Sequence, residues 1–211
     1  MKVGIIGTGN IGLSLGKALT KKGYKVMFAS HSLARANEAA GEMEHNAVGG
    51  TVASTIHYGE IIFLAVPYKS IEDVLRNSDS FQGKVVVDCT NPLIMGNPAE
   101  LAIGFTTSAA EQIAKMIPAA RVVKAYNTAF AQHIANGPYF GPNDASMFYC
   151  GDDADAKASV ARLIEATGFE PVDCGPLSSA RLLEPMAVLI VRLGNNMGMG
   201  SEIAFKLLKR D

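Results

Sequence analysis

Residues 2–12, KVGIIGTGNIG, decide the fold of this chain. A short apolar strand runs directly into a GxGxxG pattern made by Gly7, Gly9 and Gly12, and an apolar helical pattern follows at once. This order predicts a dinucleotide-binding turn. Gly7 would permit the tight turn, Gly9 would let the backbone approach a pyrophosphate, and Gly12 would let the helix pack close to the strand. The unpaired amides at the start of that helix would then face the phosphates.

The end of the second predicted strand, Lys25–Ala29, indicates which nucleotide is bound. Proteins that bind NAD place an acidic residue about 20 residues after the glycines, where it holds the ribose 2′-hydroxyl. Here Ser30, His31, Ser32 and Arg35 follow the strand, and no acid occurs before Asn37. Hydroxyl donors and a guanidinium favour a 2′-phosphate, which a carboxylate would repel. We therefore predict NADP(H). An ordinary helix start, with Ser32 as the N-cap, is compatible with the same residues.

Strand and helix patterns alternate along the whole chain, which predicts an α/β protein. We expect a Rossmann-type, doubly wound, mostly parallel sheet in residues 1–130. Residues 131–211 would add a small C-terminal βαβ and helical subdomain that completes the cofactor cleft. The expected strands are Lys2–Ile6, Lys25–Ala29, Val52–Ala53, Ile61–Val66, Lys84–Asp88, Arg121–Ala125, Met147–Cys150 and Glu170–Asp173. The expected helices are Ile11–Lys22, Leu33–Glu44, Ser54–Tyr58, Ile71–Arg76, Ser108–Ile117 and Ala154–Thr167.

Two segments are harder to interpret. The stretch Asn127–Asp144 is rich in Gly, Pro and Asn, and we expect a functional loop there. The tail Ser178–Lys209 is expected to be mostly helical, with interruptions at Gly194, Gly198 and Gly200.

In a doubly wound sheet, ligands lie over the carboxyl ends of the strands, where the strand order reverses. Pro67 could brace a nicotinamide ring or only end its strand. Asn91 and Asn127 could bond a carboxamide or substrate or only form turns, and His133 could face the substrate. The pattern predicts no catalytic acid, base or nucleophile, because cofactors carry the chemistry of hydride transfer. The candidate cofactor-binding residues are Gly7, Thr8, Gly9, Asn10, Ile11, Gly12, Ser30, His31, Ser32, Arg35, Val66, Pro67, Tyr68, Asn91, Ala125 and Asn127.

Composition excludes several other classes of function. The net charge of −1 in 211 residues argues against nucleic acid or an anionic membrane as partner. The longest apolar stretch, Pro185–Leu193, is too short to span a bilayer, and the chain begins on a strand, which leaves no room for a signal peptide. Cys89, Cys150 and Cys174 are widely spaced, so we expect buried thiols in a reducing cytoplasm and no metal site.

Several motifs in a fixed order carry a family resemblance. They are GTGNIG, VP, TNPL, TTSAAEQIA, VVKAYNT, CGDDADAK and DCGPLSSARLLE, and they extend over essentially the whole chain. In this order the chain resembles the NADPH-dependent reductases of the deazaflavin coenzyme F420. It is equally similar to the cytosolic NADPH-oxidoreductase domain of the STEAP metalloreductases.

The resemblance implies hydride transfer between NADP(H) and a deazaflavin (F420) or a flavin such as FMN or FAD. It also implies nucleotide contacts at Thr8, Gly9, Asn10, Ile11, Ser30, His31, Arg35, Val66, Pro67 and Ala125. The chain departs from the deazaflavin enzymes at His31, where they usually have arginine. It departs again at Asn127, where they tend to read His-Thr-Ile-Pro-Ala and the STEAP domain has the Asn form.

Two other functions fit the glycine loop. One is a non-catalytic NADP(H)-sensing module. The other is an enzyme of the β-hydroxyacid dehydrogenase type, whose catalytic lysine and asparagine resemble Lys124 and Asn127. That class needs a long helical second domain, for which too few residues follow Asp173.

The apolar segment Pro185–Leu193 predicts a homodimer contact through the C-terminal helix, with an intra-chain core contact as the alternative.

Overall fold

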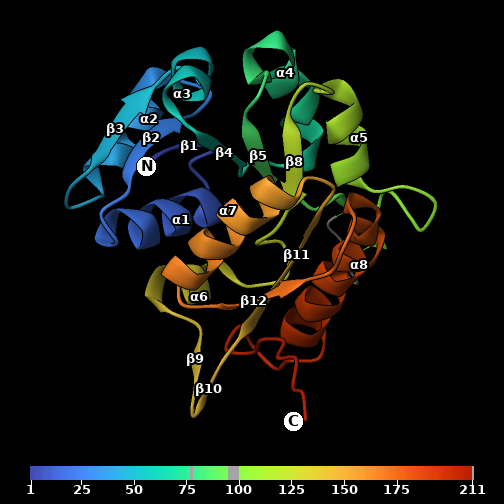
Figure 1. The fold of residues 1–211 in the computed structure, drawn as a ribbon. Coiled ribbons are helices and arrows are strands. Elements are labelled where there is room, and N and C mark those ends of the chain that lie inside the picture. The colour runs from blue at the N-terminus through green and yellow to red at the C-terminus, as the bar shows by residue number, and fades with distance from the viewer. Residues whose placement is uncertain (77, 95–99, 211) are drawn as a thin grey trace.

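The computed structural model describes residues 1–76, 78–94 and 100–210. One eight-stranded sheet runs through the centre of the molecule, in the order β12-β11-β8-β5-β4-β1-β2-β3 (Figure 1). The strands are β1 (Lys2–Ile6), β2 (Lys25–Ala29), β3 (Ala47–Gly50), β4 (Ile61–Leu64), β5 (Val85–Asp88), β8 (Arg121–Lys124), β11 (Ser146–Gly151) and β12 (Glu170–Asp173).

The predicted fold class is confirmed. Strands β3, β2, β1, β4, β5 and β8 are all parallel and follow the doubly wound order. Strand β11 pairs antiparallel with β8 and parallel with β12, so the C-terminal βαβ unit extends the same sheet. The strand order reverses between β1 and β4, and the two strands pair there directly.

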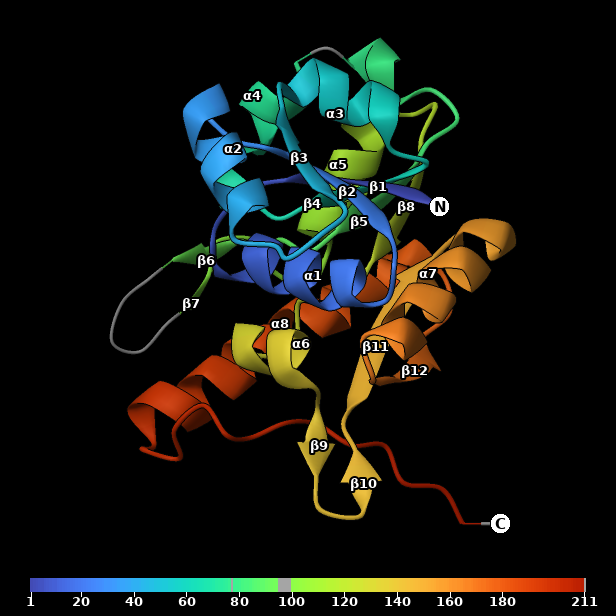
Figure 2. The same ribbon diagram turned by 90° about the vertical axis from the view of Figure 1, so that its left-hand side faces the viewer.

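Helices cover both faces of the sheet, as the views in Figures 1 and 2 show. On one face Leu15 and Leu19 of α1, Ile134 of α6 and Val160 of α7 are buried against the sheet. On the other face lie α3, α4, α5 and α8. The helices are α1 (Asn10–Lys21), α2 (Leu33–Gly41), α3 (Val52–Tyr58), α4 (Ile71–Leu75), α5 (Ala109–Met116), α6 (Ala131–Asn136), α7 (Ala154–Ala166) and α8 (Ala180–Val191).

Two expectations about elements are wrong. The third strand is Ala47–Gly50, and Val52–Ala53 instead begins α3. The segment Asn127–Asp144 is no plain loop, because it holds α6 and the hairpin of β9 (Tyr139–Phe140) and β10 (Asn143–Asp144). The structure also contains a short antiparallel pair, β6 (Leu93–Ile94) and β7 (Glu100–Leu101), for which the sequence patterns made no prediction.

The C-terminal tail is helical only in its first part. Helix α8 passes into a π-helical turn, Arg192–Asn196, and residues 201–210 form neither helix nor strand. This last stretch lies beside β11, since Ser146 N donates to the Phe205 carbonyl and Leu207 N donates to Ser146 Oγ. Two hydrogen bonds to Ser146, rather than helix propensity, therefore hold this stretch.

Candidate nucleotide-binding site

A pocket of about 510 Å³ opens over the carboxyl ends of β1, β2 and β4, at the reversal of strand order. Its lining combines glycine backbone, small apolar side chains and a few polar groups. The lining residues are Ile6, Gly7, Gly9, Ser30, His31, Val52, Ala65, Val66, Pro67, Ser70, Asp73 and Val74.

The three glycines of the first turn meet different steric demands. Gly7 has φ +118°, and a Cβ there would lie 2.1 Å from the Ala65 carbonyl oxygen. A Cβ on Gly12 would lie 2.0 Å from the Gly7 carbonyl oxygen. A Cβ on Gly9 would have no atom within 4 Å apart from those of its neighbours in the chain, so this backbone borders open space. Gly7 and Gly12 are required by the fold, whereas Gly9 leaves room for a ligand.

Helix α1 begins beside this open space. Its N-cap is Gly9, no side chain caps it, and its first turn contains no acidic residue. The first amides of α1 therefore keep their hydrogen-bonding capacity, and the helix dipole adds positive potential there. An anionic group such as a pyrophosphate fits this end of the pocket.

A short chain of polar contacts joins the glycine turn to the end of β2. Thr8 Oγ1 lies 3.0 Å from Ser30 Oγ, and Ser30 Oγ lies 3.3 Å from His31 Nδ1. Ser32 caps α2, since its Oγ accepts from Arg35 N at 3.2 Å. These hydroxyl and imidazole groups offer hydrogen bonds to a ribose or its phosphate without a negative charge.

Arg35 is on the exposed first turn of α2, where Nη1 contacts Glu38 Oε2 at 3.0 Å. Both side chains are about half exposed, so the pair contributes little to stability. A phosphate near Ser30 and Ser32 could therefore compete with Glu38 for the guanidinium at little cost.

Six of the sixteen residues predicted for the cofactor line the pocket: Gly7, Gly9, Ser30, His31, Val66 and Pro67. Thr8, Asn10, Ile11 and Gly12 belong to the same turn and the start of α1, and Ser32 and Arg35 to the start of α2. Sequence reasoning missed six lining residues, which are Ile6, Val52, Ala65, Ser70, Asp73 and Val74. Most come from helices and turns beside the strand ends, and strand-end patterns carry no signal for them.

The remaining predicted residues lie further along the carboxyl edge of the sheet. Tyr68 Oη donates to Gln112 Oε1 of α5 at 2.5 Å, and Ala125 is fully buried after β8. Asn91 and Asn127 bond each other: Asn127 Nδ2 donates to Asn91 Oδ1 at 3.0 Å, and Asn91 Nδ2 donates to the Asn127 carbonyl at 3.1 Å. The two asparagines thus link the segment that follows β5 to the segment that follows β8.

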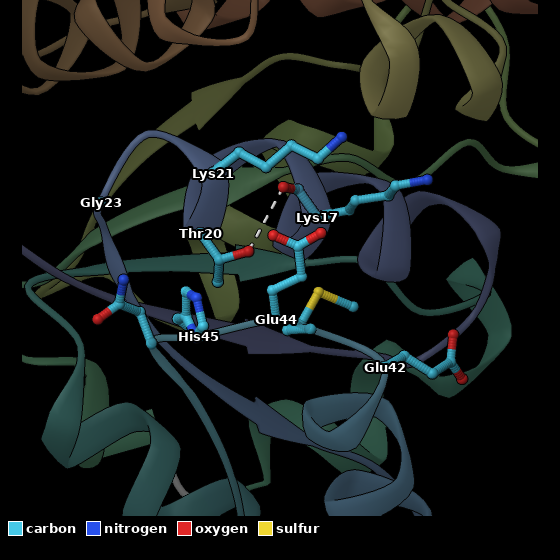
Figure 3. A pocket seen from close by; sticks show the side chains of 9 residues that line it. Lys17, Thr20, Lys21, Gly23, Glu42, Glu44 and His45 are labelled. Carbon is cyan, nitrogen blue, oxygen red and sulfur yellow. Dashed lines mark hydrogen bonds between the residues drawn. The ribbon is translucent and has the colours of Figure 1, made fainter.

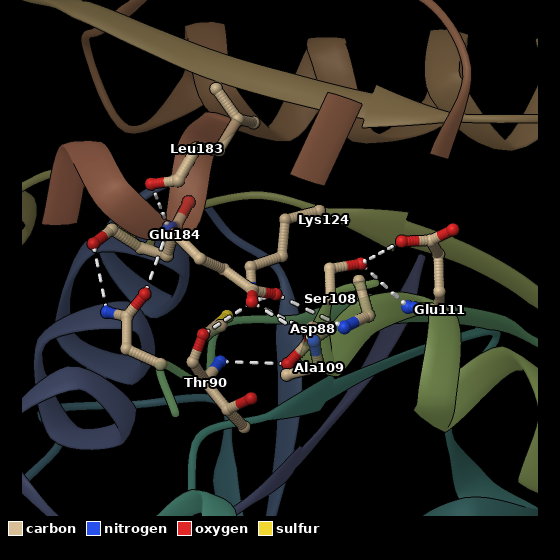
Figure 4. A network of polar contacts seen from close by, with 12 residues as sticks. Asp88, Thr90, Ser108, Ala109, Glu111, Lys124, Leu183 and Glu184 are labelled. Atoms are coloured by element: carbon tan, nitrogen blue, oxygen red, sulfur yellow. Dashed lines mark hydrogen bonds and ion pairs between the residues drawn. The ribbon is translucent and has the colours of Figure 1, made fainter. Parts of the chain in front are cut away.

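A buried ion network lies under this edge (Figure 4). Lys124 Nζ contacts Asp88 Oδ2 at 2.8 Å and Glu184 Oε1 of α8 at 3.2 Å, and it also donates to the Thr90 carbonyl. Glu184 in turn accepts from the first amides of α5, at Ala109 and Ala110. One ammonium and one helix N-terminus thus compensate two buried carboxylates.

The charge state of Lys124 follows from these partners. Burial by itself lowers the pKa of Lys124, but the carboxylates of Asp88 and Glu184 outweigh it and raise the pKa above its usual 10.5. With its ammonium fully buried and saturated by acceptors, Lys124 is unavailable to a substrate. The structure therefore does not support Lys124 as the catalytic lysine of a β-hydroxyacid dehydrogenase.

The cysteines and His133 offer no nucleophile or base at the pocket. Burial raises the pKa of Cys89 well above its usual 9.0 and that of Cys150 to about 12, and none of the three thiols is paired. Burial lowers the pKa of His133, which packs edge-on against Phe130 and Phe140. None of these residues lines the nucleotide pocket.

A second pocket of about 330 Å³ lies at the other end of α1, around Lys17, Lys21 and Glu44 (Figure 3). Cations and carboxylates share this pocket, which gives it no net preference for an anion. Within residues 1–76, 78–94 and 100–210, no group of three or more His, Cys, Asp or Glu side chains could hold a metal ion. In the same residues no helix has the length and apolar character needed to cross a bilayer.

Fold and pocket together define a Rossmann-type nucleotide-binding protein. Comparison with known proteins narrows this class. The family model described as NADP oxidoreductase, coenzyme F420-dependent, matches residues 2–92. Among solved structures, a protein provisionally described as an F420-dependent NADP-reductase from Arthrobacter sp. FB24 superimposes with a TM-score of 0.90. It is 28% identical over 99% of this chain and 100% of that one.

Curated relatives agree with that match. The F420-dependent NADP reductase of Methanocaldococcus jannaschii is 27% identical, with 92% of each chain covered. Metalloreductase STEAP3 of Rattus norvegicus is 32% identical over 90% of this chain, which spans only 37% of the length of STEAP3. The predicted resemblance is confirmed, since the chain is similar over nearly its whole length to F420-dependent NADP reductases.

Proposed function

We propose that this protein is an oxidoreductase that transfers a hydride between NADP(H) and a deazaflavin such as F420, or a flavin. The observation that carries the proposal is the pocket at the strand-order reversal, where Gly9 and the uncapped start of α1 border open space. The relatedness to NADP-dependent reductases supports the same reading.

The pocket fits NADP(H) on its own chemistry. Gly9 and the first amides of α1 would hold the pyrophosphate, and Ser30, His31 and Arg35 would hold the ribose 2′-phosphate. Val66 and Pro67 offer an apolar wall that excludes water. NADP(H), when bound, supplies the hydride donor or acceptor, so the protein's own task is to align two rings in a dry site.

The acceptor is tested by following NADPH oxidation at 340 nm with F420, FMN and FAD offered separately. Turnover with F420 alone would support the deazaflavin as the second substrate. Turnover with FMN or FAD alone would place the protein nearer the STEAP domain. Absence of turnover with all three acceptors would contradict the proposal and favour the NADP(H)-sensing module.

The nucleotide preference is tested at Ser30. In Ser30→Asp a carboxylate would stand where the 2′-phosphate is expected, so Kd for NADPH should rise at least tenfold while Kd for NADH falls or stays unchanged. Ser30→Ala serves as the matched control, because it removes the hydroxyl without adding charge. Equal binding of NADPH and NADH by the unmodified protein would contradict the assignment of NADP(H).

Two further properties belong to the proposal. We expect a homodimer formed through α8, whose Leu182 and Leu189 are 66% and 48% exposed. A cytoplasmic location agrees with three unpaired thiols.

A further inference from the structure

The orientation of the Asn127 carboxamide is fixed by two backbone carbonyls. Asn91 Nδ2 must face the Asn127 carbonyl, which can only accept, so Asn91 Oδ1 faces Asn127. Asn127 Nδ2 then donates to Asn91 Oδ1 and, at 2.9 Å, to the Leu183 carbonyl of α8. A flipped amide would set oxygen against oxygen at Leu183. Both N–H groups of Asn127 Nδ2 are therefore used as donors, and Asn127 Oδ1 is the side-chain atom that remains without a partner.

Asn127 Oδ1 has no hydrogen-bond partner, although the residue is only 5% exposed. A buried acceptor without a donor costs roughly 1–3 kcal/mol, and native proteins rarely leave one unmatched. The hydroxyls of Thr90 and Thr128 are also buried and without a partner. All three groups follow β5 or β8, so these two strand ends present one acceptor and two possible donors without partners.

The place of these groups along the sheet edge indicates what they meet. Ser30 and His31 follow β2 and would face the adenosine half of a bound dinucleotide, and Val66 and Pro67 follow β4. A dinucleotide that crosses the strand-order reversal carries its second base toward β5 and β8. The nicotinamide carboxamide has an N–H₂ donor and a carbonyl acceptor, which match a free amide oxygen and a free hydroxyl.

We propose that Asn127 is a cofactor-binding residue whose Oδ1 accepts a hydrogen bond from the N–H₂ of the nicotinamide carboxamide. This inference rests on the proposed binding of NADP(H). Asn91 and the Leu183 carbonyl hold the acceptor in place, so α8 takes part in orienting the nicotinamide ring. The role needs no proton transfer, because the amide only accepts a hydrogen bond.

The test compares Kd for NADP⁺ with Kd for its 3-acetylpyridine analogue, in which a methyl group replaces the amide nitrogen. The unmodified protein should prefer NADP⁺ by about tenfold, the worth of one buried hydrogen bond. Asn127→Leu should lose that preference by weakening only the binding of NADP⁺. Thr55→Val is the matched control, because Thr55 Oγ1 is also buried without a partner but lies in α3. It should keep the preference.

The outcomes of this comparison separate a failure of the role of Asn127 from a failure of the proposed NADP(H) binding. Equal affinities in the unmodified protein would overturn the role of Asn127 while leaving NADP(H) binding intact, and this result needs no folded variant. A preference that persists in Asn127→Leu would overturn it too, and would assign the free oxygen to water or the second substrate. If the unmodified protein binds neither nucleotide, the proposed function falls, and the role of Asn127 with it.

Discussion

At the scale of single residues, the glycine turn separates what the fold requires from what the ligand requires. A sequence pattern treats Gly7, Gly9 and Gly12 alike. The structure distinguishes them, because a Cβ at Gly7 or Gly12 meets backbone at 2.1 or 2.0 Å, whereas a Cβ at Gly9 meets nothing within 4 Å. The backbone of Gly9 has φ −83°, which any residue can adopt.

Gly9→Ala should therefore keep stability within about 1 kcal/mol of the unmodified protein but raise Kd for NADPH at least tenfold. Its methyl group would occupy the space where a pyrophosphate approaches the backbone. Gly12→Ala should instead lower the free energy of unfolding by several kcal/mol. Thermal unfolding and nucleotide fluorescence titration measure the two effects. Equal nucleotide affinity in Gly9→Ala would argue against this turn as the phosphate site.

Polar residues near a strand end and their local partners can be found from the sequence, but their partners on distant segments cannot. The sequence predicted Ser32 as an N-cap, and the structure confirms it through Arg35 N. The pairing of Arg35 with Glu38 depends on a helix turn. The saturation of Lys124 by Asp88 and Glu184 depends on packing between segments up to 96 positions apart. Tertiary contacts of this kind leave no local pattern.

At the scale of elements, long apolar runs made the central strands predictable, and β3 shows where this fails. Its sequence, AVGG, ends in two glycines and has the weakest strand signal in the sheet. Gly49 is required, because a Cβ there would lie 2.6 Å from the backbone nitrogen of Asn37, whereas a Cβ on Gly50 would have to displace the Met27 side chain, whose Sδ lies 2.7 Å away. Close packing of α2 and β2 against β3 overrides strand propensity there.

The buried network predicts a large effect from a single charge. Lys124→Met should lower the free energy of unfolding by about 3–5 kcal/mol, because Asp88 and Glu184 would stay buried with no cation. Adding Asp88→Asn and Glu184→Gln to that variant should recover much of the loss. Lys157→Met is the matched control. It breaks a 2.9 Å pair with a half-exposed Asp173 and should cost under about 1 kcal/mol. Urea unfolding measures all three variants, and a similar loss in Lys124→Met and Lys157→Met would contradict this assignment.

The contact between α5 and α8 predicts a dependence of stability on pH. The Arg181 guanidinium, which bonds Glu111 at 2.6 and 2.8 Å, lowers the pKa of Glu111 below its usual 4.5. A lowered pKa in the folded state stabilises the fold above about pH 4.5, and the gain disappears as the pH falls through the lowered value. In Glu111→Gln, the free energy of unfolding should therefore fall less steeply between pH 5 and about pH 3 than in the unmodified protein, as measured by urea unfolding. An unchanged acid limb would contradict this prediction.

At the scale of the whole molecule, the described chain packs one core on each side of one sheet, yet α8 belongs only partly to it. Leu183, Ala187 and Ile190 are buried, and Leu183 belongs to the core on the α5 side of the sheet, whereas the same helix exposes Leu182 and Leu189. Met197 and Met199, in the turn after it, are 69% and 57% exposed. The sequence indicated apolar residues around most of this helix, but only the fold shows which of them the chain itself covers.

The exposed side of α8 carries the last prediction. Apolar side chains gathered on one helix are typical of an interface, and two-fold pairs are the commonest assembly. Leu189→Glu would place a charge on this apolar side of α8, so the protein should shift from dimer to monomer in light scattering at micromolar concentration. Exposed Leu33 on α2 provides the matched control, and Leu33→Glu should leave the mass unchanged. A monomeric mass for the unmodified protein would remove the dimer and leave the apolar side of α8 to another partner.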